Sequence, residues 1–205
     1  MSSLIMHVCI SNIIKQKYDY GYEFLLGSIM PDILKNSGED KNKVHYRTKD
    51  NYNLYEIDKF VKKNMLTEKT EYNLGYLAHL IQDKFLAKYT NRKIKESYID
   101  GQDYITYIFD NDSLHKKQEF LDLIHNDYAI IDQYLIKKYD LNMDYMLKRI
   151  LRVNKEEKYD KIIEDKLKIH DIIPESTLKI FNILDIEQYI RECINEYDRY
   201  IEEEL

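Results

Sequence analysis

The chain has 205 residues, of which 44% are hydrophobic and 33% are charged, and its formal net charge is -6. This length allows one domain, covering residues 1–205, with a substantial hydrophobic core. The acidic balance argues against a nucleic-acid-binding protein, which usually carries a basic face, but it is compatible with a small phosphate-containing substrate.

Glycine and proline are scarce, and hydrophobic residues recur at helical spacing along almost the whole chain. Few residues that break helices and no strand-like alternation predict an all-α fold, a multi-helix bundle in a single domain. The predicted helices are, in chain order, Ser3–Lys17, Tyr20–Ile29, Asn53–Met65, Glu71–Tyr89, Tyr104–Phe109, Ser113–Asp127, Ile130–Lys138, Met143–Val153, Glu156–Ile169 and Asp185–Glu203.

The breaks between these helices are also predicted from residue type. Pro31 is expected to end the second helix, and a break at Pro174 is followed by a predicted helix cap at Ser176 or Thr177. Polar loops or turns are predicted at Lys35–Lys43, Thr67–Thr70 and Thr90–Gln102.

The two cysteines, Cys9 and Cys193, lie near opposite ends of the chain and form no Cys-x-x-Cys pair, so a zinc site with thiolate ligands is not expected. The apolar run near the N-terminus has no basic leader and is predicted to be the first helix, not a signal peptide. No apolar run is long enough for a transmembrane segment. A cytoplasmic protein is therefore expected.

The segment Gly75–Phe85, GYLAHLIQDKF, places His79 and Asp83 four residues apart in a largely apolar stretch. Residues i and i+4 share one face of a helix, and burying a carboxylate or an imidazole without a partner is costly. A divalent metal ion satisfies both groups because it binds an imidazole nitrogen and a carboxylate oxygen. A simple hydrogen bond between His79 and Asp83 is the alternative.

Three further residues have the chemistry of metal ligands, namely His7 on the first predicted helix, Asp32 after Pro31, and His45 after a polar loop. Imidazole and carboxylate ligands without thiolates favour a catalytic site for zinc, manganese or iron. Such an ion makes bound water a nucleophile because it lowers the pKa of that water toward about 7. Each residue also has a structural interpretation: the histidines can be satisfied within the core or at its rim, and Asp32 can cap the following turn.

In this order, the motifs LLGSIMPDI, HYR and GYLAHLIQDKF, preceded by His7, resemble the zinc-dependent phospholipase C family. The family has an early histidine, a G-x-x-x-PD carboxylate, a histidine that opens a helix after a loop, and an H-x-x-x-D pair. The resemblance covers roughly the first 90 residues and is most specific in the G-x-x-x-PD and H-x-x-x-D motifs. It implies an all-helical fold related to that of the single-strand-specific zinc nucleases.

By position, the resemblance implies that His45, His79, Asp83 and Asp32 hold a first metal ion. It implies that His7 holds a second ion, with Asp83 as the bridging ligand. Asp32 also falls where the family has its candidate general base, so it is the expected catalytic residue that orients or deprotonates the attacking water. The expected cofactor is one or two zinc ions, with manganese or iron as alternatives.

The chain departs from the family pattern at its periphery. Tyr89 stands where the family has a histidine six residues after the H-x-x-x-D aspartate. His115 and Glu119 have the spacing of the pair that completes that metal site in the family, but an exposed pair on a helix is the favoured interpretation. The chain has no Trp, which is the N-terminal ligand of secreted members. One or two metal ions are therefore expected, not three.

The leading functional prediction is a metal-dependent, phospholipase C-like hydrolase of a small phosphoester. Arg47 and Lys84 neighbour the ligand positions; surface salt bridges are expected for both, with phosphate binding as the alternative. A competing prediction is a non-catalytic helical protein that holds a structural metal or a polar core. A third is an interaction module that uses the tyrosine-rich face of the last helix.

Overall fold

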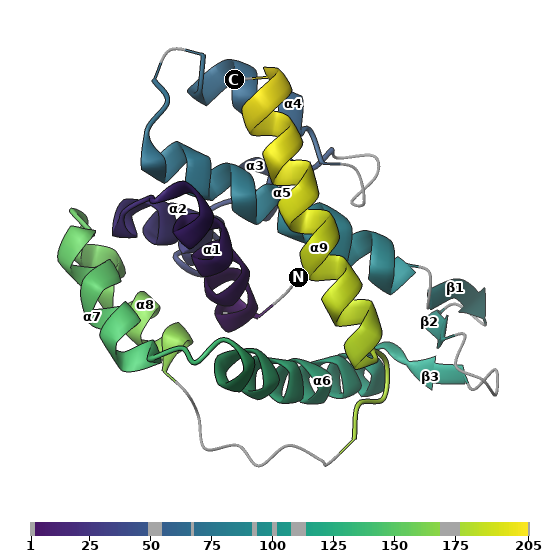
Figure 1. Cartoon of the computed structure of the whole chain (residues 1–205). Coiled ribbons are helices and arrows are strands. Elements are labelled where there is room, and N and C mark those ends of the chain that lie inside the picture. The colour runs from purple at the N-terminus through teal and green to yellow at the C-terminus, as the bar shows by residue number, and fades with distance from the viewer. Residues whose placement is uncertain are drawn as a thin grey trace.

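The computed structural model describes residues 3–48, 55–66, 68–91, 94–99, 102–107, 114–168 and 177–204, and between residues 94 and 118 it describes the backbone alone. Helices dominate the molecule, so the predicted all-α fold class is confirmed (Figure 1). They are α1 (Leu4–Tyr18), α2 (Tyr22–Asn36), α3 (Lys41–Val44), α4 (Ile57–Asn64), α5 (Glu71–Asn91), α6 (Lys117–Lys138), α7 (Met143–Val153), α8 (Asp160–Leu167) and α9 (Ile183–Arg199).

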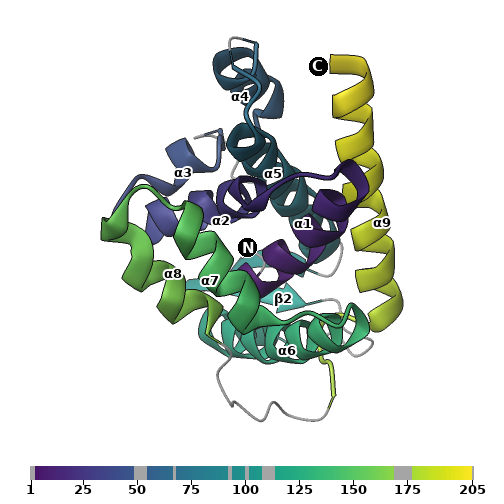
Figure 2. The same cartoon turned by 60° about the vertical axis from the view of Figure 1, so that its left-hand side comes forward.

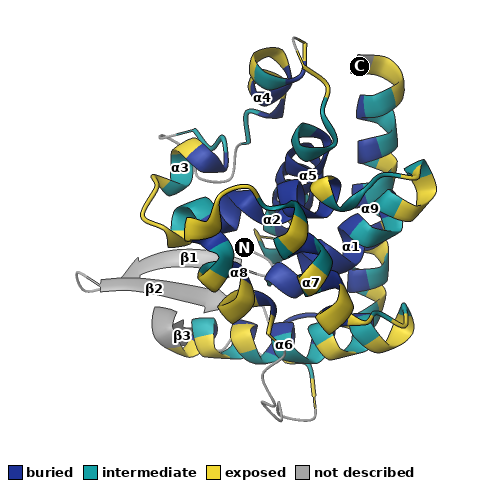
Figure 3. Cartoon of the chain, turned by 90° about the vertical axis from the view of Figure 1, so that its left-hand side faces the viewer, coloured by how far each residue is buried: buried dark blue, intermediate teal, exposed yellow. Residues whose placement is uncertain are grey.

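Helices α2 and α5 form the central pair of the bundle. Helix α1 packs against α2, and α9 packs against α5, while α6 contacts α1 and α7 contacts α2 (Figures 1 and 2). Buried residues from these helices form one hydrophobic cluster, and the exposed residues lie on the outward faces (Figure 3). Among the described residues, no helix is both long and apolar enough to cross a membrane.

Helix α2 does not end before Pro31, as the sequence predicted, but continues through it to Asn36. Proline lacks the N–H group for one helical hydrogen bond, yet neighbouring turns and tertiary packing hold the helix together. Asp32 therefore lies inside the helix and does not cap a turn. The loop predicted at Lys35–Lys43 is therefore shorter in the structure, because α2 ends at Asn36 and α3 begins at Lys41.

Three short strands were not predicted. Strands β1 (Ile94–Ile99), β2 (Gln102–Tyr107) and β3 (Leu114–Lys116) form an antiparallel sheet in the order β1-β2-β3. The polar loop predicted at Thr90–Gln102 and the helix predicted at Tyr104–Phe109 are therefore wrong. The run of tyrosine, isoleucine and threonine in β2 has high strand propensity, which outweighed its helix-like apolar spacing.

The C-terminal half also differs in its helix boundaries. Helix α6 is continuous where two helices were predicted, and α8 follows a short 3₁₀ turn at Glu157–Tyr159. Helix α9 is capped by Asn182, whose side chain accepts a hydrogen bond from the N–H of Asp185, so the predicted cap at Thr177 is wrong. The residues Pro174 and Ser176 lie outside the described part of the chain. A π-helical turn, Tyr200–Glu204, extends α9.

The apolar face of α9 is buried within the protein. Tyr189 and Tyr197 have no exposed surface, and the hydroxyl of Tyr189 donates a hydrogen bond to the carbonyl oxygen of Gln82 on α5. The predicted use of this face for a partner protein is therefore wrong, because α5 and its neighbours already cover it.

Candidate metal centre

Five polar side chains from four helical segments meet in the core. His7 comes from α1, Asp32 from α2, His45 from the end of α3, and His79 and Asp83 from α5. All five are buried, and together they are called the His/Asp cluster below. His45 ends the short helix α3 rather than opening a helix, since it is the residue that follows Val44.

Close packing of α2 on α5 brings Asp32 toward His79 and Asp83. Two glycines make this approach possible: a Cβ atom on Gly27 would lie 2.0 Å from the carbonyl oxygen of Tyr72, and one on Gly75 would lie 1.9 Å from that of Phe24. Only glycine tolerates such backbone contact. The glycine of the G-x-x-x-PD motif therefore acts on the site through the distance between two helices.

Asp83 lies at the centre of the cluster. Its Oδ2 atom is 3.7 Å from Nε2 of His45 and 3.8 Å from Nε2 of His79, and its Oδ1 atom is 3.5 Å from Nε2 of His7. Asp32 Oδ1 lies 3.3 Å from the same nitrogen of His45. In two triplets, His7–Asp32–His79 and His45–His79–Asp83, all ligand atoms lie within 4.8 Å of one another.

The outer nitrogens of the three imidazoles are held by oxygen atoms. Nδ1 of His79 lies 2.8 Å from the carbonyl oxygen of Ser28, Nδ1 of His45 lies 3.1 Å from that of Lys41, and Nδ1 of His7 lies 2.9 Å from Oε1 of Gln82. An oxygen acceptor at Nδ1 favours the tautomer with its proton on Nδ1. The Nε2 atom then directs its lone pair inward. All three rings thus present the same atom to the cluster.

Five of the inward atoms have no hydrogen-bond partner in the part of the chain that the structure describes. Among the described residues, Asp32 Oδ1, His45 Nε2, His79 Nε2 and both carboxylate oxygens of Asp83 are buried and have no hydrogen-bond partner. Each such group costs about 1–3 kcal/mol or more when charged. A divalent cation fits this arrangement, because nitrogen and oxygen lone pairs converge on one place and no buried thiolate accompanies them.

The protonation states also suit a metal ion. Burial raises the pKa of Asp32, but its contact with His45 and the nearby rings of His79 and His7 outweigh burial and lower that pKa to about 2. Burial opposes ionisation of Asp83 as well, yet His7 and His79 hold its pKa well below the usual value. Burial, together with His7, lowers the pKa of His79 to about 3. Ionised carboxylates and a neutral imidazole are the forms that bind metals.

The proposed additional pair does not assemble on one helix. His115 lies on strand β3 and Glu119 in the first turn of α6, where its side chain is exposed, so the helical pair predicted for these two residues is wrong. The side chain of His115 lies outside the described part of the structure. Tyr89 is buried against α9, and its hydroxyl donates a hydrogen bond to Glu192 Oε1 at 3.1 Å.

The two basic residues near the ligands behave differently. Lys84 forms the expected surface pair, 3.0 Å from Glu196. Arg47 instead points inward, with Nη2 3.9 Å from Asp83 Oδ2. Gln82 was not expected at the site, although it lies beside Asp83 in an apolar helix; its amide bridges His7 and Ser11. The contact of His79 with the carbonyl oxygen of Ser28 could not be predicted from side-chain patterns, because that oxygen belongs to the backbone.

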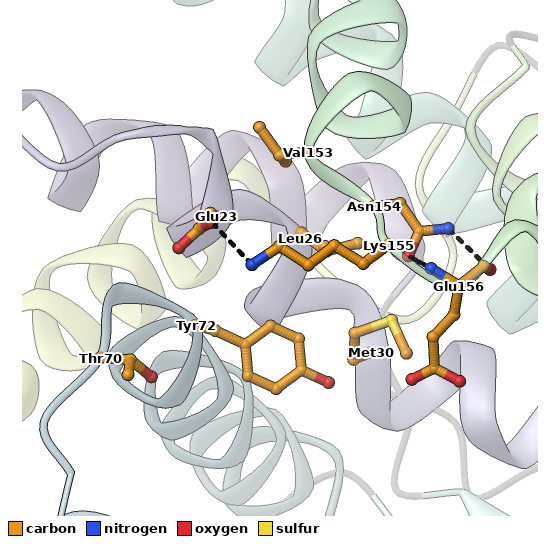
Figure 4. A pocket seen from close by; sticks show the side chains of 9 residues that line it. All are labelled: Glu23, Leu26, Met30, Thr70, Tyr72, Val153, Asn154, Lys155 and Glu156. Atoms are coloured by element: carbon orange, nitrogen blue, oxygen red, sulfur yellow. Dashed lines mark hydrogen bonds and ion pairs between the residues drawn. The ribbon is translucent and has the colours of Figure 1, made fainter.

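Solvent reaches the cluster through Asp32. Its side chain is 8% exposed, whereas the other four are at most 1% exposed. Asp32 lines a cavity of about 450 Å³ between α2 and α6, with Lys35 on one side and Tyr128 and Asp132 on the other. A second cavity, of about 260 Å³, lies between α2, the start of α5 and the segment after α7 and includes no residue of the cluster (Figure 4).

A family model described as zinc dependent phospholipase C matches residues 6–196 of the chain. The match includes all five residues of the His/Asp cluster and extends into α9. Comparisons with curated proteins and with solved structures gave no match.

Proposed function

The chain belongs to the zinc-dependent phospholipase C family, and from this premise we propose that it is a metal-dependent hydrolase of a small phosphoester. The observation that carries the proposal is the set of buried lone pairs in the His/Asp cluster that have no hydrogen-bond partner among the described residues. A folded protein keeps such groups together when a ligand compensates them.

The proposed ligands of a first ion are Asp32, His45, His79 and Asp83. His7 is proposed to hold a second ion with Asp83 as the bridge, which is supported by the position of Asp83 between Nε2 of His7 and Nε2 of His45 and His79. When bound, a zinc ion supplies Lewis-acid polarisation of the phosphoryl oxygen and lowers the pKa of a bound water. The ordering of the imidazoles by Ser28, Lys41 and Gln82 would keep the site ready for binding.

Asp32 is proposed as the residue that orients the attacking water. Its partial exposure to the 450 Å³ cavity supports this role, because water from that cavity reaches Asp32 before the other residues of the cluster. With a pKa lowered to about 2, its carboxylate is a weak base at neutral pH. It is therefore better suited to accept a hydrogen bond from the water than to remove its proton completely.

Two measurements test the proposal. Elemental analysis of protein purified without chelators should find one or two equivalents of zinc, and the protein should hydrolyse 4-nitrophenyl phosphate or bis(4-nitrophenyl) phosphate. The double variant His79→Ala/Asp83→Asn should lose both the metal and the activity. Full hydrolysis by this variant would contradict the proposed mechanism.

A non-catalytic role is the second candidate, and the deep burial of the cluster favours it. Four of the five side chains are at most 1% exposed, as in a structural metal site. This role predicts bound metal, no hydrolysis of either phosphoester, and a large loss of stability on metal removal. Hydrolysis that depends on the cluster would exclude it.

A cytoplasmic location is proposed as well. The thiols of Cys9 and Cys193 are both buried and unbonded to each other, which supports a reducing compartment. Fractionation of cells that express the full-length protein would test this, and recovery outside the cytoplasm would contradict it.

A further inference from the structure

Arg47 is a largely buried cation directed at the His/Asp cluster. Its side chain is 11% exposed, and its Nη2 atom lies 3.9 Å from Oδ2 of Asp83, the same oxygen that His45 and His79 approach. Its Nε atom is buried without a hydrogen-bond partner among the described residues. The guanidinium therefore has donor capacity left beside the cluster.

The side chains of the residues on either side of Tyr46 both approach Asp83. Tyr46, between His45 and Arg47, has a left-handed φ of 50°, a conformation that is uncommon for a bulky residue. It is held there by ring contacts with Phe60 and Tyr76 at centroid distances of 5.2 and 6.4 Å. On either side of this turn, His45 ends α3 and Arg47 pairs with Tyr55, and both side chains approach Oδ2 of Asp83.

Tyr55 fixes the direction of the Arg47 side chain. The guanidinium lies over the Tyr55 ring, 4.8 Å from its centroid, and Nη2 donates a hydrogen bond to the hydroxyl of Tyr55. The two residues also pair through their backbones in an isolated antiparallel bridge. An arginine that is stacked and hydrogen-bonded in this way loses little entropy when it binds an anion.

The charges at the site require an anion once a metal ion is present. Asp32 and Asp83 carry two negative charges, which one divalent ion neutralises, so that the charge of Arg47 remains unbalanced. The guanidinium and a nearby metal ion are both positive and repel each other, and an anion that contacts both removes this repulsion. Arg47 also lines a cavity of about 750 Å³ together with three lysines, Lys43, Lys59 and Lys63, and two carboxylates, Asp40 and Glu56, of which Glu56 pairs with Lys59. The cations outnumber the carboxylates there, so the outer side of Arg47 attracts anions.

We propose that Arg47, held by Tyr55, binds the phosphoryl group of the substrate on the Asp83 side of the cluster. Its N–H groups donate to the nonbridging oxygens, and these hydrogen bonds are charge-assisted. This inference rests on the proposed phosphoester hydrolysis. In this arrangement an arginine, and not a further metal ion, neutralises negative charge on the phosphoryl group.

The test measures binding of inorganic phosphate to the metal-loaded protein by calorimetry, with the metal content of each variant determined in parallel. Arg47→Gln should weaken phosphate binding about 10- to 100-fold, as expected for a lost charge-assisted hydrogen bond. Arg47→Lys, which keeps the charge but loses the planar group, should weaken it several-fold, and Tyr55→Phe by less. Lys84→Gln is the matched control, because it removes a surface cation next to Asp83 and should leave phosphate affinity unchanged.

Kinetics on the phosphoester substrates provide a second readout. Arg47→Lys should raise KM more than it lowers kcat, with unchanged metal content. Unchanged phosphate affinity in both Arg47 variants would overturn the inference, and so would loss of the metal in both, because Arg47 would then support the metal site itself. If the wild type binds phosphate through Arg47 but hydrolyses neither substrate, the proposed function fails while the anion site stands.

Discussion

Replacing Gly75 with alanine tests whether helix spacing controls the metal site. The added Cβ would lie 1.9 Å from the carbonyl oxygen of Phe24, and an ordinary contact begins near 3.4 Å. Helices α2 and α5 must therefore separate by about 1.5 Å at this point, because the obstacle is backbone and has no alternative rotamer. His79 lies one turn further along α5, and its 2.8 Å contact with the Ser28 carbonyl would then exceed hydrogen-bond length.

Two terms of opposite sign set the size of the effect of Gly75→Ala. Overpacking costs about 1–3 kcal/mol, and the lost hydrogen bond at His79 costs about 1 kcal/mol. Alanine returns about 1 kcal/mol through its higher helix propensity. We expect a net loss of about 1–3 kcal/mol in the free energy of unfolding, measured by urea denaturation. Since the oxygen that orients His79 moves away, metal affinity should also fall about 10- to 100-fold.

Gly38→Ala is the matched control for this experiment. Gly38 has a φ of 105° and no atom within 4 Å of the added Cβ, so its replacement should cost about 1–2 kcal/mol through backbone strain alone. Metal affinity should stay at the wild-type value. The reasoning is refuted if Gly75→Ala binds the metal as tightly as the wild type, or if Gly38→Ala weakens binding to the same extent.

Three further predictions concern single residues. Asp83→Asn should abolish stoichiometric metal binding, as judged by elemental analysis, because Asp83 contacts three imidazoles of the cluster; retained stoichiometry would remove Asp83 from the centre of the site. Burial raises the pKa of Asp132 to about 7. The carboxyl group therefore ionises at lower pH in the unfolded protein than in the folded one, and the free energy of unfolding falls as the pH rises from about 4 to 7. Asp132→Asn should remove up to about 3 kcal/mol of the loss between pH 5 and pH 8, and parallel stability curves for the two proteins would contradict the assignment. Tyr89→His should add no metal ion and should lose the hydrogen bond to Glu192, at a cost of about 1 kcal/mol; a higher metal content would show that this end of α5 is competent to bind one.

The sequence predicted the centre of the site better than its surroundings. His79 and Asp83 follow from helical periodicity, since one face of α5 is set by spacing alone. Asp32 lies beside the other residues of the cluster, but its place within α2 was misjudged because the rule that proline ends helices ignores tertiary packing around α2. The inward direction of Arg47 was missed because the side chain is held by Tyr55, and this tertiary contact leaves no periodic pattern in the sequence.

The two halves of α5 have different neighbours. The first half lies against α2 through Gly75 and presents His79 and Asp83 to the cluster. The second half turns its polar side chains to α9, where Lys84 pairs with Glu196, and Lys88 and Tyr89 both contact Glu192.

These outer pairs are partly exposed and contribute about 0–1 kcal/mol each, so they select the orientation of α9 more than they stabilise it. The stabilisation comes from apolar burial on the same face of α9, which includes Tyr189 and Cys193. A histidine at position 89 would have to exchange its contact with α9 for a metal ion whose other expected ligands, His115 and Glu119, are not presented on one helix. Tyr89 therefore fits a helix whose first half faces the His/Asp cluster and whose second half packs against α9.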